Sequence, residues 1–261
     1  LQAKTFVVNV ILNYILIKEI TVLVQVIFGE EFVNKFIFDV DGTLTPSRQE
    51  IDGDFAVYFS NFCIDNDVYL VTGSDKEKTV EQVGEEIYSL AKRVYNCSGS
   101  DVWEGENNVY TSNWHLPHEA EKWLRTECRI SEFPLRTGLH IEKRPGMVNF
   151  SVVGRHATMG ERKLYVKHDV KTNERVRIAK EFKAQFPDIE AVVGGETGID
   201  IFPVGKDKSQ IINDFDKTDK LYFFGDRMDK DGNDYTLSLK VHWARSVTGW
   251  VQTKETLCYL Q

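Results

Sequence analysis

The amino-acid sequence predicts an α/β protein whose parallel-sheet core is interrupted by an inserted α+β domain. Two observations support this prediction. In the first and last parts of the chain, short apolar runs alternate with helical segments, a rhythm that is typical of parallel sheets. Between them, the run MVNFSVV at 147–153 places Asn149 and Ser151 between apolar residues. Such alternation is typical of an antiparallel sheet with one polar face.

The expected elements follow one another along the chain in a regular order. In the first part of the core we expect an apolar strand through Phe38, a strand at 68–72 and a helix from 77 to about 93. In the insert we expect a helix at 118–128, the strand at 147–153, a helix with Val176, Ala179, Phe182 and Phe186 on one side, and a strand at 191–193. In the last part we expect a helix at 209–215, the buried strand LYFFG at 221–225, and a final strand and helix. This pattern assigns residues 35–111 and 207–261 to the core domain and residues 112–206 to the insert.

Residues 1–34 lie outside this pattern, although they are rich in Val, Ile and Leu. Their longest uncharged run, 6–17, is shorter than the roughly 18 to 20 residues that cross a bilayer. No small-residue cleavage site of the kind that ends a signal peptide follows this run. We therefore expect no membrane span there and treat the segment as an N-terminal extension to which we assign no role.

Charge and cysteine content restrict the class of protein. The net charge is −8 and no Lys/Arg run forms a basic patch, so we do not expect a nucleic-acid partner. The four cysteines are far apart and form no C-x-x-C pair, which argues against a structural zinc site or a disulfide framework. A reducing cytoplasm fits this composition best.

Two of the predicted strand ends are rich in carboxylates. Asp39 and Asp41 follow the first strand in FIFDVDGT, and Asp226 follows LYFFG, with Asp234 in the same loop. Ligands bind at the carboxyl ends of parallel strands. Crowded carboxylates need a cation such as Mg²⁺ or a shared proton. An isolated D-x-D-G is as often a plain turn, but two acidic strand ends in one sheet favour a shared Mg²⁺ site.

Two smaller features complete a phosphoryl-binding pattern. Ser74 follows another strand in LVTGSD, and Lys208 begins a helix after the insert. A hydroxyl, backbone N–H groups and an ammonium suit the oxygens of a transferring phosphoryl group. The order of D-x-D-G-T, strand-end Ser, Lys and G-D resembles the haloacid dehalogenase (HAD) superfamily of phosphotransferases. The resemblance implies a HAD-like Rossmannoid core with the insert as an α+β cap domain, and it makes Ser74 and Lys208 catalytic residues.

The resemblance also implies roles for the aspartates. Asp39 would be the nucleophile that becomes an aspartyl phosphate, and Asp41 would be the general acid and base. Mg²⁺ would be held by the Asp39 carboxylate, the Asp41 main-chain carbonyl and Asp226. Asp234 would be a further ligand or would support one. Mg²⁺ would reduce the repulsion between the carboxylates and the phosphate.

Three arginines of the insert, Arg144, Arg155 and Arg162, lie close in sequence to Asn149 on the predicted polar strand face. A single arginine is usually a surface charge, but three around one strand indicate a site for a phosphate other than the transferred one. Their run resembles the eukaryotic-type phosphomannomutases, which carry R-x-G-M-x-N-x-S-x-x-G-R and then a further Arg. The segment GGETGIDIFPVGKDK, which contains Asp200, resembles a second stretch of that family.

This second resemblance implies an activity. Arg48 and the cap arginines would hold the distal phosphate of a hexose, and Asn149 and Asp200 would contact the sugar. A strand-end turn is the less favoured alternative for Asp200. The implied reaction interconverts mannose 6-phosphate and mannose 1-phosphate through an aspartyl phosphate, with a hexose 1,6-bisphosphate as activator. Family members are often homodimers through the cap. A Mg²⁺-dependent sugar-phosphate phosphatase with the same core is the alternative, and a regulatory module without catalysis is disfavoured because the catalytic aspartates and Lys208 are present.

Three stretches depart from the family pattern. Gly198 stands where the family usually has Ser, which removes one contact unless Thr197 supplies it. The loop after Asp226 reads RMDKDGND in place of K-T-x-x-G-G-N-D. NCSGS at 96–100 replaces a P-E-N-G-like stretch before the cap.

Overall fold

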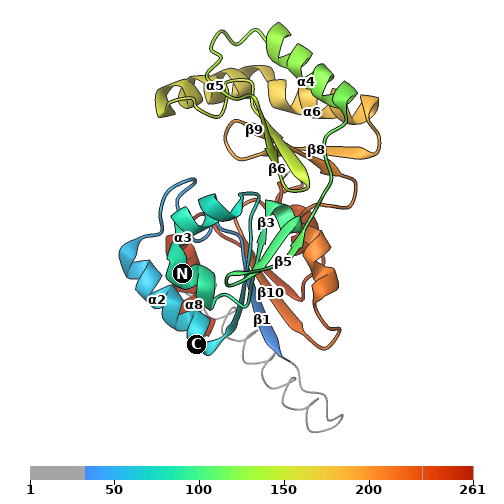
Figure 1. The fold of residues 1–261 in the computed structure, drawn as a ribbon. Helices are drawn as coiled ribbons and strands as arrows, with labels where there is room; N and C mark the ends of the chain where they lie inside the picture. The colour runs from blue at the N-terminus through green and yellow to red at the C-terminus, as the bar shows by residue number, and fades with distance from the viewer. Residues whose placement is uncertain (1–32, 231, 261) are drawn as a thin grey trace.

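The computed structural model describes residues 33–230 and 232–260, which form two sheets in separate layers (Figure 1). The larger sheet has the strand order β11-β10-β1-β2-β3-β4-β5. Its strands are β1 (Asn34–Phe38), β2 (Asp67–Val71), β3 (Arg93–Asn96), β4 (Asp101–Glu104), β5 (Asn107–Thr111), β10 (Lys220–Gly225) and β11 (Trp243–Ser246). The smaller sheet has the order β6-β7-β9-β8. Its strands are β6 (Ile141–Arg144), β7 (Met147–Phe150), β8 (Ile189–Gly194) and β9 (Gly198–Pro203).

The larger sheet is parallel from β11 to β3 and antiparallel at β4 and β5. The predicted parallel core is therefore confirmed, but the antiparallel edge was not predicted. The helix expected to reach about residue 93 ends at Leu90, and residues 93–96 form β3. Strands of four or five residues are too short to give a clear period, which is why β3 to β5 were missed.

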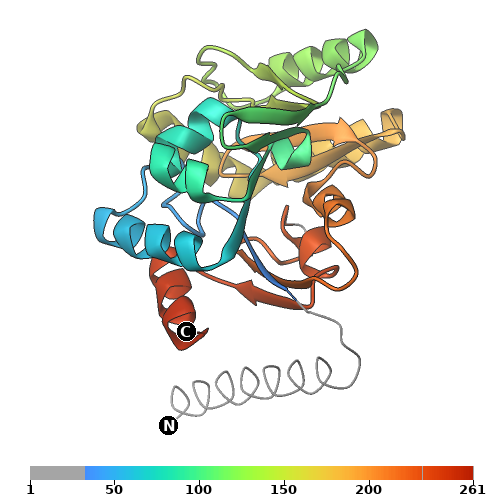
Figure 2. The same ribbon diagram turned by 60° about the horizontal axis from the view of Figure 1, so that its bottom comes forward.

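Helices cover both faces of the larger sheet (Figures 1 and 2). On one face lie α2 (Gly53–Asp65), α3 (Lys76–Leu90) and α8 (Trp250–Leu260), which pack on Phe36 and Phe38 of β1. On the other lie η2 (Lys208–Asp214) and α7 (Tyr235–Ser238), which pack on Ile37. Because side chains alternate along a strand, the apolar run of β1 serves both faces at once. The expected helix at 209–215 is a 3₁₀ helix.

The smaller sheet forms the cap with α4 (His118–Ile130), α5 (Met159–Thr172) and α6 (Glu174–Gln185). Val148 and Phe150 of β7 lie in the apolar cluster of the sheet with these helices, so the alternation around Asn149 and Ser151 does mark a strand with two different faces. The polar face is buried, because it points to a cavity and not to bulk water. The expected apolar side of α6 is partly wrong: Val176 is exposed and Ile178 is buried in its place.

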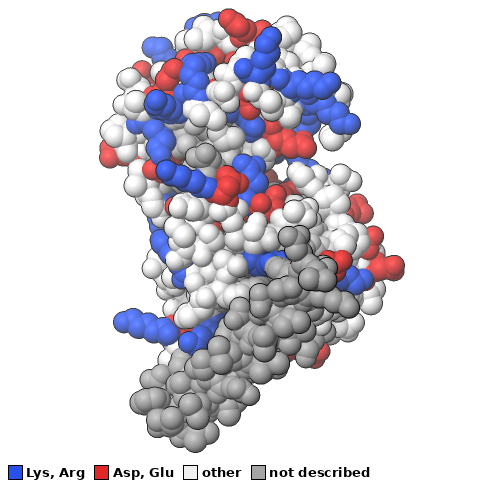
Figure 3. Space-filling view, turned by 180° about the vertical axis from the view of Figure 1, so that it is seen from behind, with Lys and Arg blue, Asp and Glu red and all other residues white. Residues whose placement is uncertain are grey.

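Residues 1–32 lie outside the described part of the chain, so the prediction made for the N-terminal extension also falls outside it. Asn34, which was assigned to that extension, is already the first residue of β1. Within the described residues, no helix combines the length and apolar character that a bilayer crossing requires. The four cysteines are free, and Cys258 is the exposed one. On the face seen in Figure 3, Lys and Arg side chains are interspersed with Asp and Glu over the cap, without one continuous basic surface.

Candidate active site

The strand ends of the larger sheet converge at one edge, below the cap. Phe38 of β1 pairs with Phe224 of β10 on one side and with Leu70 of β2 on the other. Asp39, Asp226 and the loop after Val71 therefore lie side by side, because β10 and β2 flank β1 in the sheet and all three strands end at the same edge. This is the switch point of the topology, where ligands of parallel sheets bind. They line one end of a cavity of about 470 Å³, whose other end is formed by the cap.

At the acidic end of the site, three carboxylates lie close together with little access to solvent, so their negative charges repel one another. Carboxylate oxygens of Asp39, Asp226 and Asp234 lie within 4.8 Å of one another. Lys208, only 1% exposed, donates hydrogen bonds to Asp39 and, at 2.8 Å, to Asp234. Burial raises the pKa of Asp39 well above its ordinary value, against the effect of Lys208. Burial and the Asp234 charge raise the pKa of Asp226 to about 6.

The donor set fits Mg²⁺. Three carboxylates share one ammonium, so the cluster carries excess negative charge that a hard divalent cation would neutralise, and carboxylate oxygens are the ligands such a cation takes. Gly42, with φ +78°, leaves the space occupied by the Asp226 carboxylate, and a Cβ there would collide with it. The carboxylate of Asp41 is not part of this cluster, in line with the expectation that only its main-chain carbonyl would serve.

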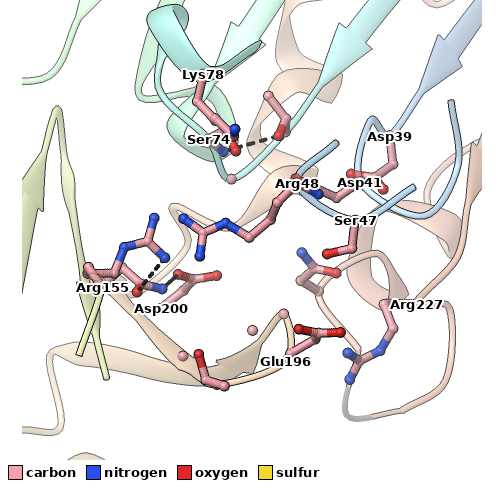
Figure 4. A pocket seen from close by; sticks show the side chains of 18 of the residues that line it. Asp39, Asp41, Ser47, Arg48, Ser74, Lys78, Arg155, Glu196, Asp200 and Arg227 are labelled. Atoms are coloured by element: carbon pink, nitrogen blue, oxygen red, sulfur yellow. Dashed lines mark hydrogen bonds between the residues drawn. The ribbon is translucent and has the colours of Figure 1, made fainter. Parts of the chain in front are cut away.

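The carboxylate of Asp41 is held by the loop that follows β1. Its Oδ1 accepts hydrogen bonds from the backbone N–H of Arg48 at 2.6 Å and from Gln82 Nε2 at 3.0 Å. Arg48 reaches this position with a left-handed backbone, φ 60°, which is uncommon outside glycine and is seen at functional sites. One residue thus supports Asp41 with its main chain while its side chain points into the cavity (Figure 4).

Ser74 lines the cavity between its two ends. Its backbone N–H donates to Thr72 Oγ1 at 3.1 Å, and its carbonyl accepts from Cys97 N at 2.8 Å. Lys78 of α3 lies beside it in Figure 4. The turn after β2 is therefore held from both sides, and Ser74 Oγ is available to a ligand in the cavity.

The far end of the cavity is lined by the four arginines named from the sequence, namely Arg48, Arg144, Arg155 and Arg162. Figure 4 shows Arg48 and Arg155 pointing toward each other across it. Burial and the neighbouring guanidinium groups lower the pKa of Arg48 and of Arg155. Like charges gathered out of water repel, so the cluster favours a polyvalent anion between them.

Glu142 holds two of these arginines in place. Its Oε2 accepts from Arg144 Nη2 and lies 2.9 Å from Arg155 Nε. Burial opposes the charge of Arg144, but Glu142 and Asp200 raise the pKa of this guanidinium. Arg144 also donates to the carbonyl of Gly73 at 2.6 Å, which joins the cap to the turn after β2.

Arg162 lies in the first turn of α5 and lines the same cavity as Asn149. It is 5% exposed, and its Nε and Nη1 have no hydrogen-bond partner among the described residues. Its Nη2 lies 3.6 Å from Glu196. A buried guanidinium with free donors facing a cavity is poised for an anionic ligand.

Asn149 and Asp200 face each other on β7 and β9, and Asn149 Nδ2 donates to Asp200 Oδ1 at 2.7 Å. Both line the cavity between its two ends. A Cβ at Gly198 would lie 2.6 Å from Asn149 Nδ2, so the departure from Ser at this position gives Asn149 room. Thr197, also at the cavity wall, is 2% exposed.

All ten residues proposed from the sequence for catalysis and substrate binding, together with the two further metal-site residues, lie at this site. Lys208 and Asp234 are buried beneath the cavity, and the others line it. The residues at or behind the wall that the sequence prediction missed include Ser47, Lys78, Gln82, Glu142, Arg175 and Arg227. Lys78 and Gln82 lie four residues apart on α3 and so share a face of that helix, but no sequence pattern indicates that this face turns toward the site.

Comparisons with known proteins identify the family. The model of the family described as eukaryotic phosphomannomutase matches residues 59–257. The chain belongs to this family. A phosphomannomutase of Drosophila melanogaster is 33% identical over 214 residues, covering 77% of this chain and 84% of that protein. Phosphomannomutase 1 of Homo sapiens is 32% identical, covering 77% of this chain and 81% of its own. The resemblance found in the cap motif is therefore confirmed.

Solved structures confirm the fold. An N-terminally truncated IMP-nucleotidase of Plasmodium falciparum superposes with a TM-score of 0.59 at 17% identity, covering 92% of this chain and 73% of that one. A HAD subclass IIB sugar phosphatase superposes with a TM-score of 0.53 at 15% identity, covering 87% of this chain and 100% of its own. The core with an α+β cap is therefore the HAD fold.

Proposed function

We propose that the protein is a phosphomannomutase-like phosphotransferase that interconverts mannose 6-phosphate and mannose 1-phosphate through an aspartyl phosphate on Asp39. The observation that carries the proposal is a single cavity lined by Asp39 and Ser74, with Lys208 buried behind them, and by four arginines farther along its wall. Asp39, Ser74 and Lys208 suit the phosphoryl group being transferred, and the four arginines suit a second phosphate on the same hexose. Membership of the phosphomannomutase family supports this assignment.

In the first half-reaction, a hexose 1,6-bisphosphate activator would place one phosphate at Asp39. An Asp39 carboxylate oxygen attacks phosphorus, the P–O bond to the sugar breaks, and Asp41 gives its proton to the leaving oxygen. Lys208 orients Asp39 through its hydrogen bond and offsets part of its charge. Mg²⁺ would further neutralise the charge of the phosphoryl oxygens. It would be held by Asp39, the Asp41 carbonyl and Asp226, with Asp234 as a direct ligand or as support for one.

In the second half-reaction, a hexose monophosphate binds with its phosphate on Arg48 and the cap arginines and its free hydroxyl toward the phosphorylated Asp39. Asp41 takes the hydroxyl proton while the oxygen attacks phosphorus. Asn149 and Asp200 offer an amide and a carboxylate to the sugar hydroxyls. The bisphosphate so formed turns end for end and returns its other phosphate to the enzyme.

The domain assignment belongs to the proposal. Residues 35–111 and 207–261 carry the transfer chemistry, and residues 112–206 form the cap that supplies distal-phosphate binding and excludes water. Contacts such as the bond from Arg144 to Gly73 hold the cap over the site. We further propose a homodimer through the cap and a reducing, cytoplasmic location, which four free cysteines suit.

Phosphorus NMR tests the reaction directly. The purified protein is mixed with Mg²⁺, mannose 1-phosphate and a trace of glucose 1,6-bisphosphate. Growth of a 6-phosphate signal that depends on the bisphosphate is the expected result. Release of inorganic phosphate without isomerisation would show that water reaches the phosphorylated enzyme, and would replace the mutase with a sugar-phosphate phosphatase.

A further inference from the structure

Gln82 of α3 is buried behind the cavity, yet its side chain contacts the proposed acid and base. It is 1% exposed. Its Nε2 donates to Asp41 Oδ1 at 3.0 Å and to Thr45 Oγ1 at 3.2 Å. The backbone N–H of Arg48 donates to the same Oδ1 at 2.6 Å. Two donors thus fix one oxygen of the Asp41 carboxylate, and no hydrogen bond from the described residues reaches the other oxygen, Oδ2.

The backbone of Gln82 holds the same loop at a second point. The helix is kinked at Gly84, which has φ 81°, and the Gln82 carbonyl accepts a hydrogen bond from Ile51 N at 2.8 Å. One residue of α3 therefore ties both the start of the loop, at Asp41 and Thr45, and its end, at Ile51. This loop carries the acid and base at one point and Arg48 at another.

The side-chain carbonyl oxygen of Gln82 has no partner in the described part of the chain, and this indicates that the amide is oriented to donate to Asp41. Gln82 Oε1 is buried without a hydrogen-bond partner among the described residues, which is unfavourable for a carbonyl oxygen. Rotating the amide would bring Oε1 against Asp41 Oδ1 and set two acceptors facing each other. The amide orientation therefore satisfies Asp41 at the expense of Gln82 itself.

We propose that Gln82 is a positioning residue for Asp41, one that fixes Oδ1 so that Oδ2 faces the cavity and carries the proton that is exchanged with the substrate oxygen. This inference rests on the proposed function and deepens it. It separates two kinds of phosphoryl donor. A sugar phosphate leaves as an alkoxide that must take the proton from Asp41 Oδ2 as the P–O bond breaks. Acetyl phosphate leaves as acetate, which is stable without that proton.

The test compares Asp39 phosphorylation by these two donors in single-turnover measurements on the full chain with Mg²⁺. The variants are Q82M, which removes the hydrogen bonds at similar volume, and Q82E, which keeps the shape and sets a carboxylate against Asp41. Both should slow labelling by glucose 1,6-bisphosphate by about 10-fold or more, within the roughly 10²- to 10⁴-fold of acid–base catalysis. The rate of labelling by acetyl phosphate should stay within about 2-fold of the wild-type rate. The amplitude of this labelling measures the fraction of protein with a folded active site.

A matched control on the same helix is T79V. Thr79 is buried, and its hydroxyl donates to Asn96 at 2.8 Å and not to the loop of Asp41. This variant should leave the ratio of the two rates unchanged. Equal slowing with both donors in Q82M and Q82E, or no slowing with the bisphosphate, would overturn the positioning role while the wild-type reaction stands. A wild-type protein that neither donor phosphorylates would overturn the proposed function and this inference together.

Discussion

The acidic cluster predicts an unusual dependence of metal-free stability on pH. Burial and the nearby Asp234 charge raise the pKa of Asp226 from 3.8 to about 6. The folded protein therefore holds this proton more tightly than the unfolded chain does. The stabilising contribution is complete below about pH 3.8 and is lost as the pH rises through about 6.

The size of the effect follows from the same shift. A difference of about two pH units, at roughly 1.4 kcal/mol per unit, corresponds to about 3 kcal/mol of unfolding free energy. Such a loss is large against the 5 to 15 kcal/mol that is roughly the whole stability of a folded protein. Mg²⁺ should restore stability at neutral pH, because it binds the ionised carboxylates of the folded state alone.

The assay is urea unfolding of the wild type and of D226N, in EDTA, between pH 4.5 and 7.5. The amide of the variant does not titrate, so the difference between the two proteins reports the titration of Asp226 together with the effect of its charge on the neighbouring Asp39 carboxyl. We expect the wild type to lose most of about 3 kcal/mol relative to D226N over this range, and Mg²⁺ to stabilise the wild type more than D226N at pH 7.5. Parallel pH profiles for the two proteins, or equal stabilisation by Mg²⁺, would refute the reasoning.

Three further changes test the site from different sides. D39N should abolish turnover while the circular dichroism spectrum is retained, and a normal rate would remove the nucleophile assignment. R155A should raise the KM for mannose 1-phosphate by about 10- to 100-fold, the loss of a charged hydrogen bond, with little effect on acetyl phosphate, and equal effects on both would contradict a distal-phosphate role. K208M should lower the unfolding free energy by about 3 to 5 kcal/mol, because two buried carboxylates lose their cation. Thermal unfolding at the wild-type temperature would contradict a stabilising role of Lys208.

The residues at strand ends could be predicted from the sequence because topology alone brings them together. Asp39, Ser74 and Asp226 each follow a short apolar run, and parallel strands end at one edge of a sheet. The cap arginines could be predicted as a group because they lie close in sequence to Asn149 on the polar face of β7. At the strand ends a local pattern determines which way the side chains point, before any distant contact is known.

The residues that support these groups could not be predicted in the same way. Gln82 in a helix and Glu142 in a strand belong to no recognisable motif. Gln82 contacts Asp41 and Glu142 contacts two arginines only because folding brings these partners near. Arg162 was named only by its sequence distance from Asn149, and it reaches the cavity from the first turn of α5. Such roles depend on how one element packs against another, which a single sequence does not specify.

One arginine connects the cap to the turn after β2. Arg144 is bound on one side to Glu142 within the cap and on the other to the carbonyl of Gly73, next to Ser74. The group proposed to bind the distal phosphate therefore contacts the turn proposed to bind the phosphoryl group being transferred. If the arginines bind the distal phosphate as proposed, a hexose phosphate would act on the contact that joins the cap to the turn beside Ser74, whereas a small monoester at Asp39 alone would not. This difference would give the site a physical means of favouring transfer to a sugar hydroxyl over transfer to water.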